Sequence, residues 1–367
     1  MSNSVACWLQ PTTGDGYIGV IRLQRGRRRN SQTLAMVAQI HQQLDLWQSD
    51  GSVMMLWLEG EGDHFCAGGD VLALAEAVAS WQQPGWCPAI VDFFAAEYRL
   101  MHRLRHWSRP VVAWGDGAVM GGGWGLFASA RWRLVTERAL LAMPEARIGL
   151  FPDVMASRFL LGLGNGVGLF AAMTAAQFGA ADALALGLAS RALASTDRQR
   201  LFNRLQALHW RGDEGDNQML EQALQCWPQP ALMDAQLLPL QPQLTLLTGA
   251  TDAGDYLRQL QAMNGPEPLW PQLQQRARAA SPLSQALIWR QQQLARSRWA
   301  EIARRELDWA VQLCHQGDFV EGVRALLVDK GRAPRWRHQW QDAEQRVEQL
   351  WPSPWAASDH PLASLRD

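Results

Sequence analysis

The sequence predicts an α/β fold that continues into a largely helical C-terminal region. Three observations support this prediction. Short apolar strands alternate with segments of helical spacing up to about residue 165. Two glycine-rich stretches each follow a strand and open a helix. After about residue 165 the strand pattern fades, and alanine- and leucine-rich or amphipathic stretches replace it.

The first part of the chain provides the predicted strands. Four short apolar runs predict strands at residues 17–24, 53–59, 111–114 and 132–136. Apolar residues at helical spacing predict a helix over residues 31–47, with Ser31 or Thr33 as its N-cap. A further helix of small residues is expected to begin in the glycine run at residues 121–123. This alternation favours α/β units over a β-sandwich.

The second part is expected to be helical, with irregular connections. Residues 198–208 are amphipathic, and residues 282–313 form a long helical stretch that is polar and arginine-rich on one face. Prolines cluster in residues 227–240, and residues 241–256 are expected to be irregular with short helices. The tail from residue 333 is expected to wrap the surface.

Composition limits the classes of function. A net charge of −1 argues against a non-specific nucleic-acid binder, because no overall positive field attracts phosphate. The five cysteines are scattered without a C-x-x-C spacing, which favours a reducing compartment over a disulfide framework or a zinc site. No run of 18 apolar residues and no secretion signal is evident. We therefore expect a cytoplasmic protein with no nucleic-acid or membrane partner.

The first candidate motif is the run His-Phe-Cys-Ala-Gly-Gly-Asp-Val at residues 64–71, which follows the second predicted strand. Gly68 and Gly69 permit a strained loop whose amides point into a cleft, with a helix beginning near Asp70. A plain strand-to-helix turn explains the same residues equally well.

The second motif is the glycine triplet Gly121, Gly122 and Gly123, which opens another helix. Amides at a helix N-terminus stabilise developing negative charge, although small residues can also serve only to let helices pack. The two loops together are more specific than either alone. An oxyanion hole needs two N–H donors on one oxygen, and two neighbouring loops of this kind supply one each.

Two carboxylates follow the triplet by about twenty residues, within residues 143–153. Glu145 is flanked by proline and apolar residues, so we expect partial desolvation and a raised pKa that suits general acid or base catalysis. Asp153 directly follows a proline. For each acid, the alternative role is that of a helix N-cap.

These stretches resemble the crotonase (enoyl-CoA hydratase/isomerase) superfamily, and more narrowly its 3-hydroxyisobutyryl-CoA hydrolase branch. Residues 65–71 resemble the first oxyanion loop, residues 120–125 the second, and residues 143–153 the signature of the hydrolase branch. Residues 321–330 resemble a segment that distinguishes this branch from shorter crotonases. Residues 281–284 also fit the second half of the family.

The resemblance implies the crotonase (ClpP/crotonase-like) spiral of ββα units with a helical C-terminal region. It covers about residues 15–340. The implied division is a crotonase core with the active site over residues 1–210, a helical region over 211–340 and a tail over 341–367. The helical region is expected to serve oligomerisation and to cover the active site, and a homo-oligomer is one expectation.

The resemblance also implies a role for each candidate residue. The two oxyanion amides fall on Gly69 and Gly122, with Gly68, Asp70 and Gly121 beside the substrate.

Three acids complete the implied site. Glu145 falls at the shared catalytic glutamate of the family, and Asp153 matches the second acid of the hydrolase branch. Glu97 matches a third acidic position that lines the substrate pocket. Without the resemblance, Glu97 reads as part of a solvated helix face.

One absence within the second motif argues against hydration. The enoyl-CoA hydratases that this chain resembles carry a second catalytic glutamate two residues after the glycine triplet, where this chain has Gly125. Hydration of a double bond needs two carboxylates that manage one water, and Gly125 has no side chain. The implied activity is therefore hydrolysis of the thioester.

The chain also departs from the hydrolase pattern. After residue 154 the family usually continues with glycines, whereas this chain has Met155, Ala156 and Ser157, which would narrow or reshape the acyl pocket. Residues 25–30 are arginine-rich where the family usually has proline and a hydrophobic residue. These arginines either meet the phosphates of coenzyme A or form an exposed basic turn.

The resemblance thus implies an acyl-CoA thioester hydrolase of the 3-hydroxyisobutyryl-CoA hydrolase type. No cofactor is implied, since coenzyme A is part of the substrate, and no metal is implied, since the oxyanion amides take the place of a Lewis acid. Two alternatives stay open: an enoyl-CoA Δ-isomerase that runs on Glu145 alone, and a non-catalytic acyl-CoA-binding protein. Valine catabolism is associated with the family and is not read from these residues.

Overall fold

The computed structural model describes residues 4–14, 16–330 and 332–367, which form two compact units interleaved along the chain. The first unit comprises the described residues of Met1–Gly69, Leu100–Leu141 and Phe178–Gln236, and the second comprises those of Asp70–Arg99, Ala142–Gln177 and Leu237–Asp367. Residues 70–99 and 142–177 therefore group with the C-terminal residues. The domain boundaries expected at residues 210 and 340 stay predictions.

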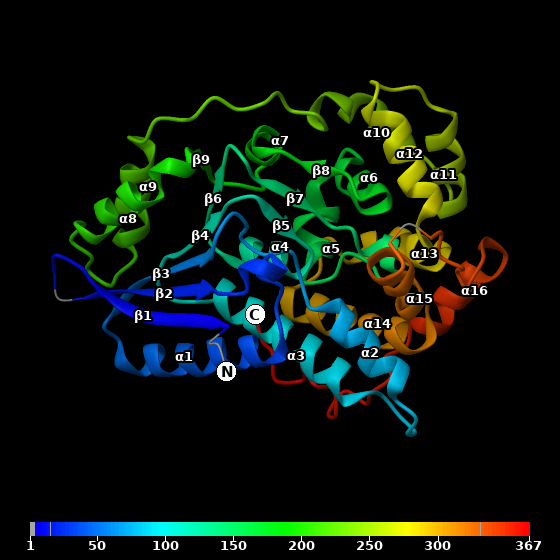
Figure 1. The fold of residues 1–367 in the computed structure, drawn as a ribbon, viewed down its shortest axis with the longest axis horizontal. Coiled ribbons are helices and arrows are strands. Elements are labelled where there is room, and N and C mark those ends of the chain that lie inside the picture. The colour runs from blue at the N-terminus through cyan, green and yellow to red at the C-terminus, as the bar shows by residue number, and fades with distance from the viewer. Residues whose placement is uncertain (1–3, 15, 331) are drawn as a thin grey trace. The chain divides into compact units, whose positions relative to one another are not determined.

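A six-stranded sheet forms the centre of the first unit (Figure 1). In spatial order its strands are β1 (Val5–Pro11), β2 (Tyr17–Leu23), β3 (Val53–Gly60), β4 (Val111–Gly115), β6 (Trp132–Thr136) and β9 (Arg191–Leu193). β1 pairs antiparallel with β2, and every later pair is parallel. Parallel strands end at the same edge of a sheet, so the loops that follow β3 and β4 leave from neighbouring positions.

A second sheet has three strands in the order β5-β7-β8. Its strands are β5 (Ala118–Met120), β7 (Leu140–Ala142) and β8 (Gln177–Phe178). The helices of the first unit are η1 (Gly26–Arg28), α1 (Leu34–Asp50), α4 (Gly122–Ser129), α7 (Ala180–Ala185), η4 (Ser195–Asp197), α8 (Arg198–Gln206) and α9 (Gly215–Gln225). A further helix, α3 (Pro88–Arg105), has residues in both units.

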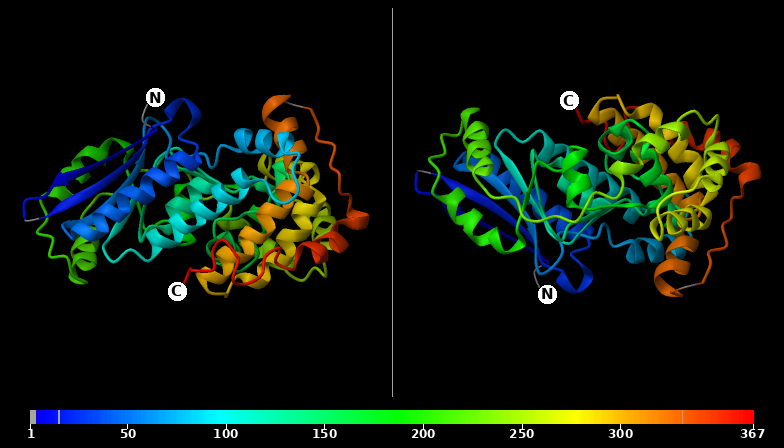
Figure 2. Two further views of the ribbon diagram at one scale, coloured as in Figure 1. Left: turned by 90° about the horizontal axis from the view of Figure 1, so that it is seen from below. Right: turned by 90° about the horizontal axis from the view of Figure 1, so that it is seen from above.

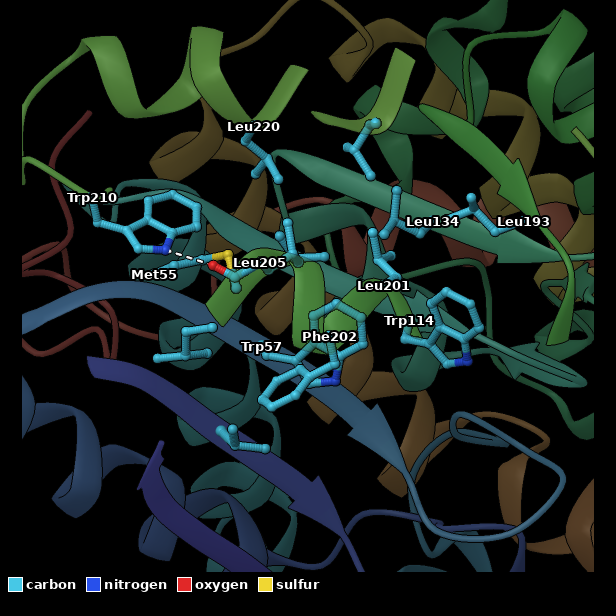
Figure 3. Packing of buried hydrophobic residues seen from close by; sticks show 14 residues of the cluster. Met55, Trp57, Trp114, Leu134, Leu193, Leu201, Phe202, Leu205, Trp210 and Leu220 are labelled. Atoms are coloured by element: carbon cyan, nitrogen blue, oxygen red, sulfur yellow. Dashed lines mark hydrogen bonds between the residues drawn. The ribbon is translucent and has the colours of Figure 1, made fainter. Parts of the chain in front are cut away.

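The core of the first unit lies on one face of the six-stranded sheet, where alternate strand residues meet α8 and α9 (Figure 3). Trp57 stacks on Trp114 with ring centroids 5.9 Å apart, and Phe202 of α8 meets Trp57 edge-on at 5.3 Å. The indole nitrogen of Trp210 donates to the Leu205 carbonyl at 2.9 Å. Helix α1 covers the opposite face. The sheet therefore lies between α1 on one side and α8 and α9 on the other (Figure 2).

The second unit is helical. Its elements are α2 (Val71–Ser80), η2 (Glu145–Ile148), α5 (Ala156–Phe159), η3 (Leu161–Leu163), α6 (Val167–Thr174), η5 (Leu238–Leu240), α10 (Gln241–Leu247), α11 (Ala253–Ala262), α12 (Leu269–Ala279), α13 (Pro282–Gln291), η6 (Gln292–Leu294), α14 (Trp299–Gln316), α15 (Phe319–Val323), η7 (Arg324–Val328) and α16 (Trp340–Leu350). Helix α13 packs against α6, α11 and α16, and α14 packs against α2, α5, α15 and α16.

The four predicted strands are confirmed as β2, β3, β4 and β6. Thr33 is the N-cap of α1, because its hydroxyl accepts the Met36 amide at 3.3 Å. The stretch expected as one helix over residues 282–313 is instead divided into α13 and α14. The Arg158 guanidinium binds the Ser297 carbonyl at 2.6 Å, and Arg298 is extended, so the helix is interrupted there.

The expectation that strands end near residue 165 is wrong, since β8 and β9 follow it. These strands span two and three residues, which is too short to display an alternating pattern. Among the described residues no single helix is long and apolar enough to cross a membrane, although Ala156–Leu163 and Val167–Thr174 together pass that test as a pair bent by 118°.

Candidate active site

The two predicted oxyanion loops lie side by side in the first unit. The loop after β3 pairs with β5, because the Cys66 amide donates to the Ala118 carbonyl at 3.0 Å and the Met120 amide donates to the Cys66 carbonyl at 2.9 Å. The triplet follows β5 directly, and Gly122 is the first residue of α4. Both glycine stretches are therefore held by one short stretch of backbone pairing.

Glycine is required in these loops by conformation and by space. Gly121 has φ +52° and ψ −129°, and Gly68 has φ +103°, which are values that residues with a side chain rarely adopt. A Cβ atom on Gly68 would lie 3.2 Å from the Met120 carbonyl oxygen and 3.5 Å from the Gly122 nitrogen. On Gly123 it would lie 2.3 Å from the Cys66 carbonyl oxygen. The backbones of the two loops thus lie too close together for a Cβ atom on Gly123.

The predicted donor amides are available for a ligand. Gly122 opens α4, and the first amides of a helix have no acceptor within the helix. Gly69 forms an isolated bridge with Gln32 in which the Gln32 amide donates to the Gly68 carbonyl at 2.8 Å. Within the described parts of the chain, neither the Gly69 nor the Gly122 amide donates to another segment. Two uncommitted amides on adjoining loops suit a carbonyl oxygen that becomes negatively charged.

The second unit contains the three predicted acids, and all three are buried. Glu97 lies on α3, Glu145 is the first residue of η2, and Asp153 lies between η2 and α5. Burial raises the pKa of Glu145 well above its usual value, and the neighbouring Asp153 raises it further. Burial, then Asp153, then Glu145 raise the pKa of Glu97. The expected desolvation of Glu145 is confirmed, and the alternative of Glu97 on a solvated helix face is wrong.

The three acids form one electrostatic group, because like charges in a shared low-dielectric site oppose each other's ionisation. The pKa of Asp153 is raised to about 6 by burial, against the lowering effect of a hydrogen bond from Tyr98. The Oε2 atom of Glu145 has no hydrogen-bond partner among the described residues. A buried carboxyl of raised pKa with one oxygen left without a partner is equipped to exchange protons with a substrate or water.

Tyr98 is a residue that the sequence analysis did not single out. Its hydroxyl donates to Asp153 Oδ2 at 2.5 Å, and its ring is fully buried. The only available signal was its place beside Glu97 in the sequence, since the partner lies 55 residues away. Tyr98 orients the Asp153 carboxyl and favours its ionised form.

The short helix with Glu145 is braced by C-terminal segments of the same unit. The Ser281 amide donates to the Ala146 carbonyl at 3.0 Å, and the Ser281 hydroxyl donates to Asp318 Oδ2 at 2.7 Å. Gly149 has φ +75°, and a Cβ atom there would lie 2.4 Å from the Asp318 carbonyl carbon. The motif at residues 281–284 thus has a structural role beside Glu145.

Gly322 has a similar role in the motif at residues 321–330. A Cβ atom on Gly322 would lie 2.4 Å from the Ile148 carbonyl carbon, so α15 packs directly on η2. Both family-like C-terminal segments therefore fix the helix that holds Glu145.

The remaining predicted residues are placed as follows. Neither Glu145 nor Asp153 is a helix N-cap, because the N-cap positions belong to Pro144 and Met155. Asp70 is at the N-cap position of α2, without a capping hydrogen bond from its side chain. Gly125 is buried within α4. The arginines at residues 27–29 are exposed in and after η1, and a contact with coenzyme A phosphates stays a prediction.

Comparison with known proteins decides the family. A model of the family described as enoyl-CoA hydratase/isomerase matches residues 18–349. The chain belongs to this family. Its curated relatives include the mitochondrial 3-hydroxyisobutyryl-CoA hydrolases of Danio rerio, 34% identical over 329 residues, and of Homo sapiens, 32% identical over 329 residues. The alignments cover 88% of this chain in both cases, and 83% and 82% of the two relatives.

Solved structures confirm the crotonase fold. A crystal structure of an enoyl-CoA hydratase from Rhodobacter sphaeroides 2.4.1 is 30% identical, with a TM-score of 0.80, and covers 96% of this chain and 98% of its own. A carnitinyl-CoA dehydratase from Mycobacterium thermoresistibile is 27% identical, with a TM-score of 0.79, covering 94% of this chain and 96% of its own. Both agreements extend over the C-terminal helical region as well as the core.

Proposed function

We propose that this protein hydrolyses acyl-CoA thioesters, with a preference for a 3-hydroxyacyl group such as 3-hydroxyisobutyryl. The buried group of Glu97, Glu145 and Asp153 is the observation that carries this proposal. Several acids in one apolar setting suit a substrate that brings a hydroxyl group, because a purely apolar acyl chain leaves them without partners. The names of the curated relatives support the same reaction.

In the proposed mechanism the thioester carbonyl oxygen accepts hydrogen bonds from the amides of Gly69 and Gly122. These donors stabilise the negative charge on that oxygen as the carbonyl carbon becomes tetrahedral. The proposal requires the amides and the acids to act on one thioester, as the family resemblance implies.

Glu145 supports the cleavage by one of two routes. As a general base, it takes a proton from water while the water oxygen bonds to the carbonyl carbon. The carbon–sulfur bond then breaks, and the coenzyme A sulfur takes up a proton. As a nucleophile, Glu145 instead bonds to the carbonyl carbon, releases the thiolate and forms an anhydride that water opens. Asp153 orients the water or binds the 3-hydroxyl group, and Glu97 lines the same polar part of the substrate pocket.

Gly125 separates this proposal from hydratase chemistry. The residue is buried in α4 and has no side chain to act on a second proton, although the structurally similar Rhodobacter protein is named an enoyl-CoA hydratase. The cytoplasmic location and the homo-oligomer stay predictions, and the curated relatives are named as mitochondrial.

A thiol-release assay on a panel of acyl-CoAs, with analysis of the acyl products, tests the proposal. We expect free thiol from 3-hydroxyacyl thioesters in preference to saturated ones. Isomerised enoyl-CoA without free thiol would assign the chain to Δ-isomerases. Binding of acyl-CoA without any product would show a non-catalytic binding protein.

A further inference from the structure

The segment that bears Asp153 has an unusual backbone, here called the Asp153 turn (residues 152–157). Val154 has φ +52° and Met155 has φ +64°, so two consecutive residues with side chains adopt the left-handed conformation. This conformation disfavours Cβ atoms, and a β-branched residue such as valine is especially disfavoured in it. The turn therefore needs support from its surroundings to keep its shape.

A buried glutamate from a distant helix provides that support. Glu306 of α14 is fully buried and accepts the Met155 amide on Oε2 at 2.5 Å. Its Oε1 atom accepts the Ser157 amide at 3.1 Å and the Ser157 hydroxyl at 2.6 Å. One carboxyl group thus uses both oxygens to hold two backbone amides of the turn.

A second buried side chain assists from α13. The Gln291 amide nitrogen donates to the Pro152 carbonyl at 2.5 Å and lies 2.9 Å from the Ser157 hydroxyl. It also lies 3.4 Å from Glu306 Oε1. The turn is thereby held at both ends by groups that come from the C-terminal helices.

We propose that Glu306 is a positioning residue for the reaction, which clamps the strained Asp153 turn so that the Asp153 carboxyl keeps its place beside Tyr98. The expected effect on kcat rests on the proposed function, whereas the clamping of the turn does not. The clamp replaces the conformational freedom that glycines would provide at residues 154 and 155. Burial and the nearby Asp153 charge raise the pKa of Glu306 to about 8, whereas the hydrogen bonds from Ser157 and Met155 lower it.

The variant Glu306→Gln tests the clamp with little change of volume. Glutamine has a single acceptor oxygen, so either the Met155 or the Ser157 amide must lose its partner. We expect faster hydrogen exchange of the backbone amides in residues 152–158. We also expect kcat for 3-hydroxyacyl-CoA hydrolysis to fall about 10- to 100-fold, since small misplacements of reacting groups have effects of this size.

A second substitution distinguishes positioning from a direct chemical role. Glycine adopts φ +64° without strain, so Met155→Gly in the Glu306→Gln background is expected to restore kcat to within a few-fold of the wild type. Failure of this rescue would overturn the proposal, because it would mean that the carboxyl itself acts in the reaction. Ser157→Ala, which removes only one donor, is a milder variant that is expected to show a smaller effect of the same kind.

Asp308→Asn is the matched control. Asp308 is a buried carboxylate on the same helix, but it accepts from Ser353 at 2.8 Å and faces His360 of the tail. It is expected to leave both kcat and exchange in residues 152–158 unchanged. Equal exchange and equal kcat in Glu306→Gln and the wild type would overturn the clamp. If the wild type hydrolyses no thioester, the proposed function fails, and the exchange comparison alone still decides the clamp.

Discussion

Tyr98→Phe is the substitution whose effect follows most directly from the geometry of the acids. It removes one hydroxyl group, whose hydrogen bond to Asp153 Oδ2 is 2.5 Å long and fully buried. A hydrogen bond to a charged group contributes about 1.5–3 kcal/mol. Because about 1.4 kcal/mol corresponds to one pKa unit, we expect the pKa of Asp153 to rise by about one to two units.

Asp153, with its pKa of about 6, is about 90% ionised at pH 7 in the wild type. In Tyr98→Phe the ionised fraction is expected to fall to between about 50% and about 10%. Carbon-13 NMR of labelled aspartate carboxyl groups, with Asp153→Asn to assign the signal, measures this midpoint directly. A midpoint unchanged from that of the wild type would refute the assigned role of Tyr98.

Three further predictions follow. Gly122→Pro removes one oxyanion amide at the first position of a helix, which tolerates proline. We therefore expect kcat to fall roughly 10²- to 10³-fold, and an unchanged kcat would contradict the role of this amide. Burial raises the pKa of Glu145, so its contribution to stability is present below about pH 4.5 and is lost as pH rises. Thermal unfolding should therefore show Glu145→Gln more stable than the wild type at pH 8, with a gap that closes toward pH 4.5; a gap independent of pH would count against a buried ionisable Glu145. Asn30→Ala removes two hydrogen bonds that the Asn30 side chain donates to the loop after β3, to the Glu61 carbonyl at 2.9 Å and the His64 carbonyl at 2.8 Å. Urea titrations should show a free energy of unfolding lower by about 2–4 kcal/mol. A change below about 1 kcal/mol would show that the loop after β3 does not depend on Asn30.

Local patterns in the sequence predicted much of the architecture and part of the site. Alternation and helical spacing placed the central strands and α1, because those elements are long enough to display a period. The flanking proline and apolar residues correctly indicated a desolvated Glu145. The glycine motifs predicted two neighbouring loops, which the hydrogen bonds between Cys66 and β5 confirm, while their role as an oxyanion site stays a prediction.

The parts that sequence analysis missed depend on long-range packing. Glu306 accepts a hydrogen bond from Met155 of the Asp153 turn, 151 residues away in the sequence, and Tyr98 donates one to Asp153, 55 residues away. In the amphipathic helix α14, a glutamate that faces a buried turn has the same sequence signature as one that faces solvent. The left-handed conformation of Val154 and Met155 was equally hidden, because neither residue type indicates it.

Glu145 is the centre of the proposed chemistry, and Glu145→Gln tests it most directly. Turnover of 3-hydroxyisobutyryl-CoA and equilibrium binding of coenzyme A should be measured on the same preparations of the variant and the wild type. We expect the variant to bind coenzyme A as the wild type does but to lose nearly all thioester hydrolysis. Hydrolysis by Glu145→Gln at the wild-type rate would contradict it.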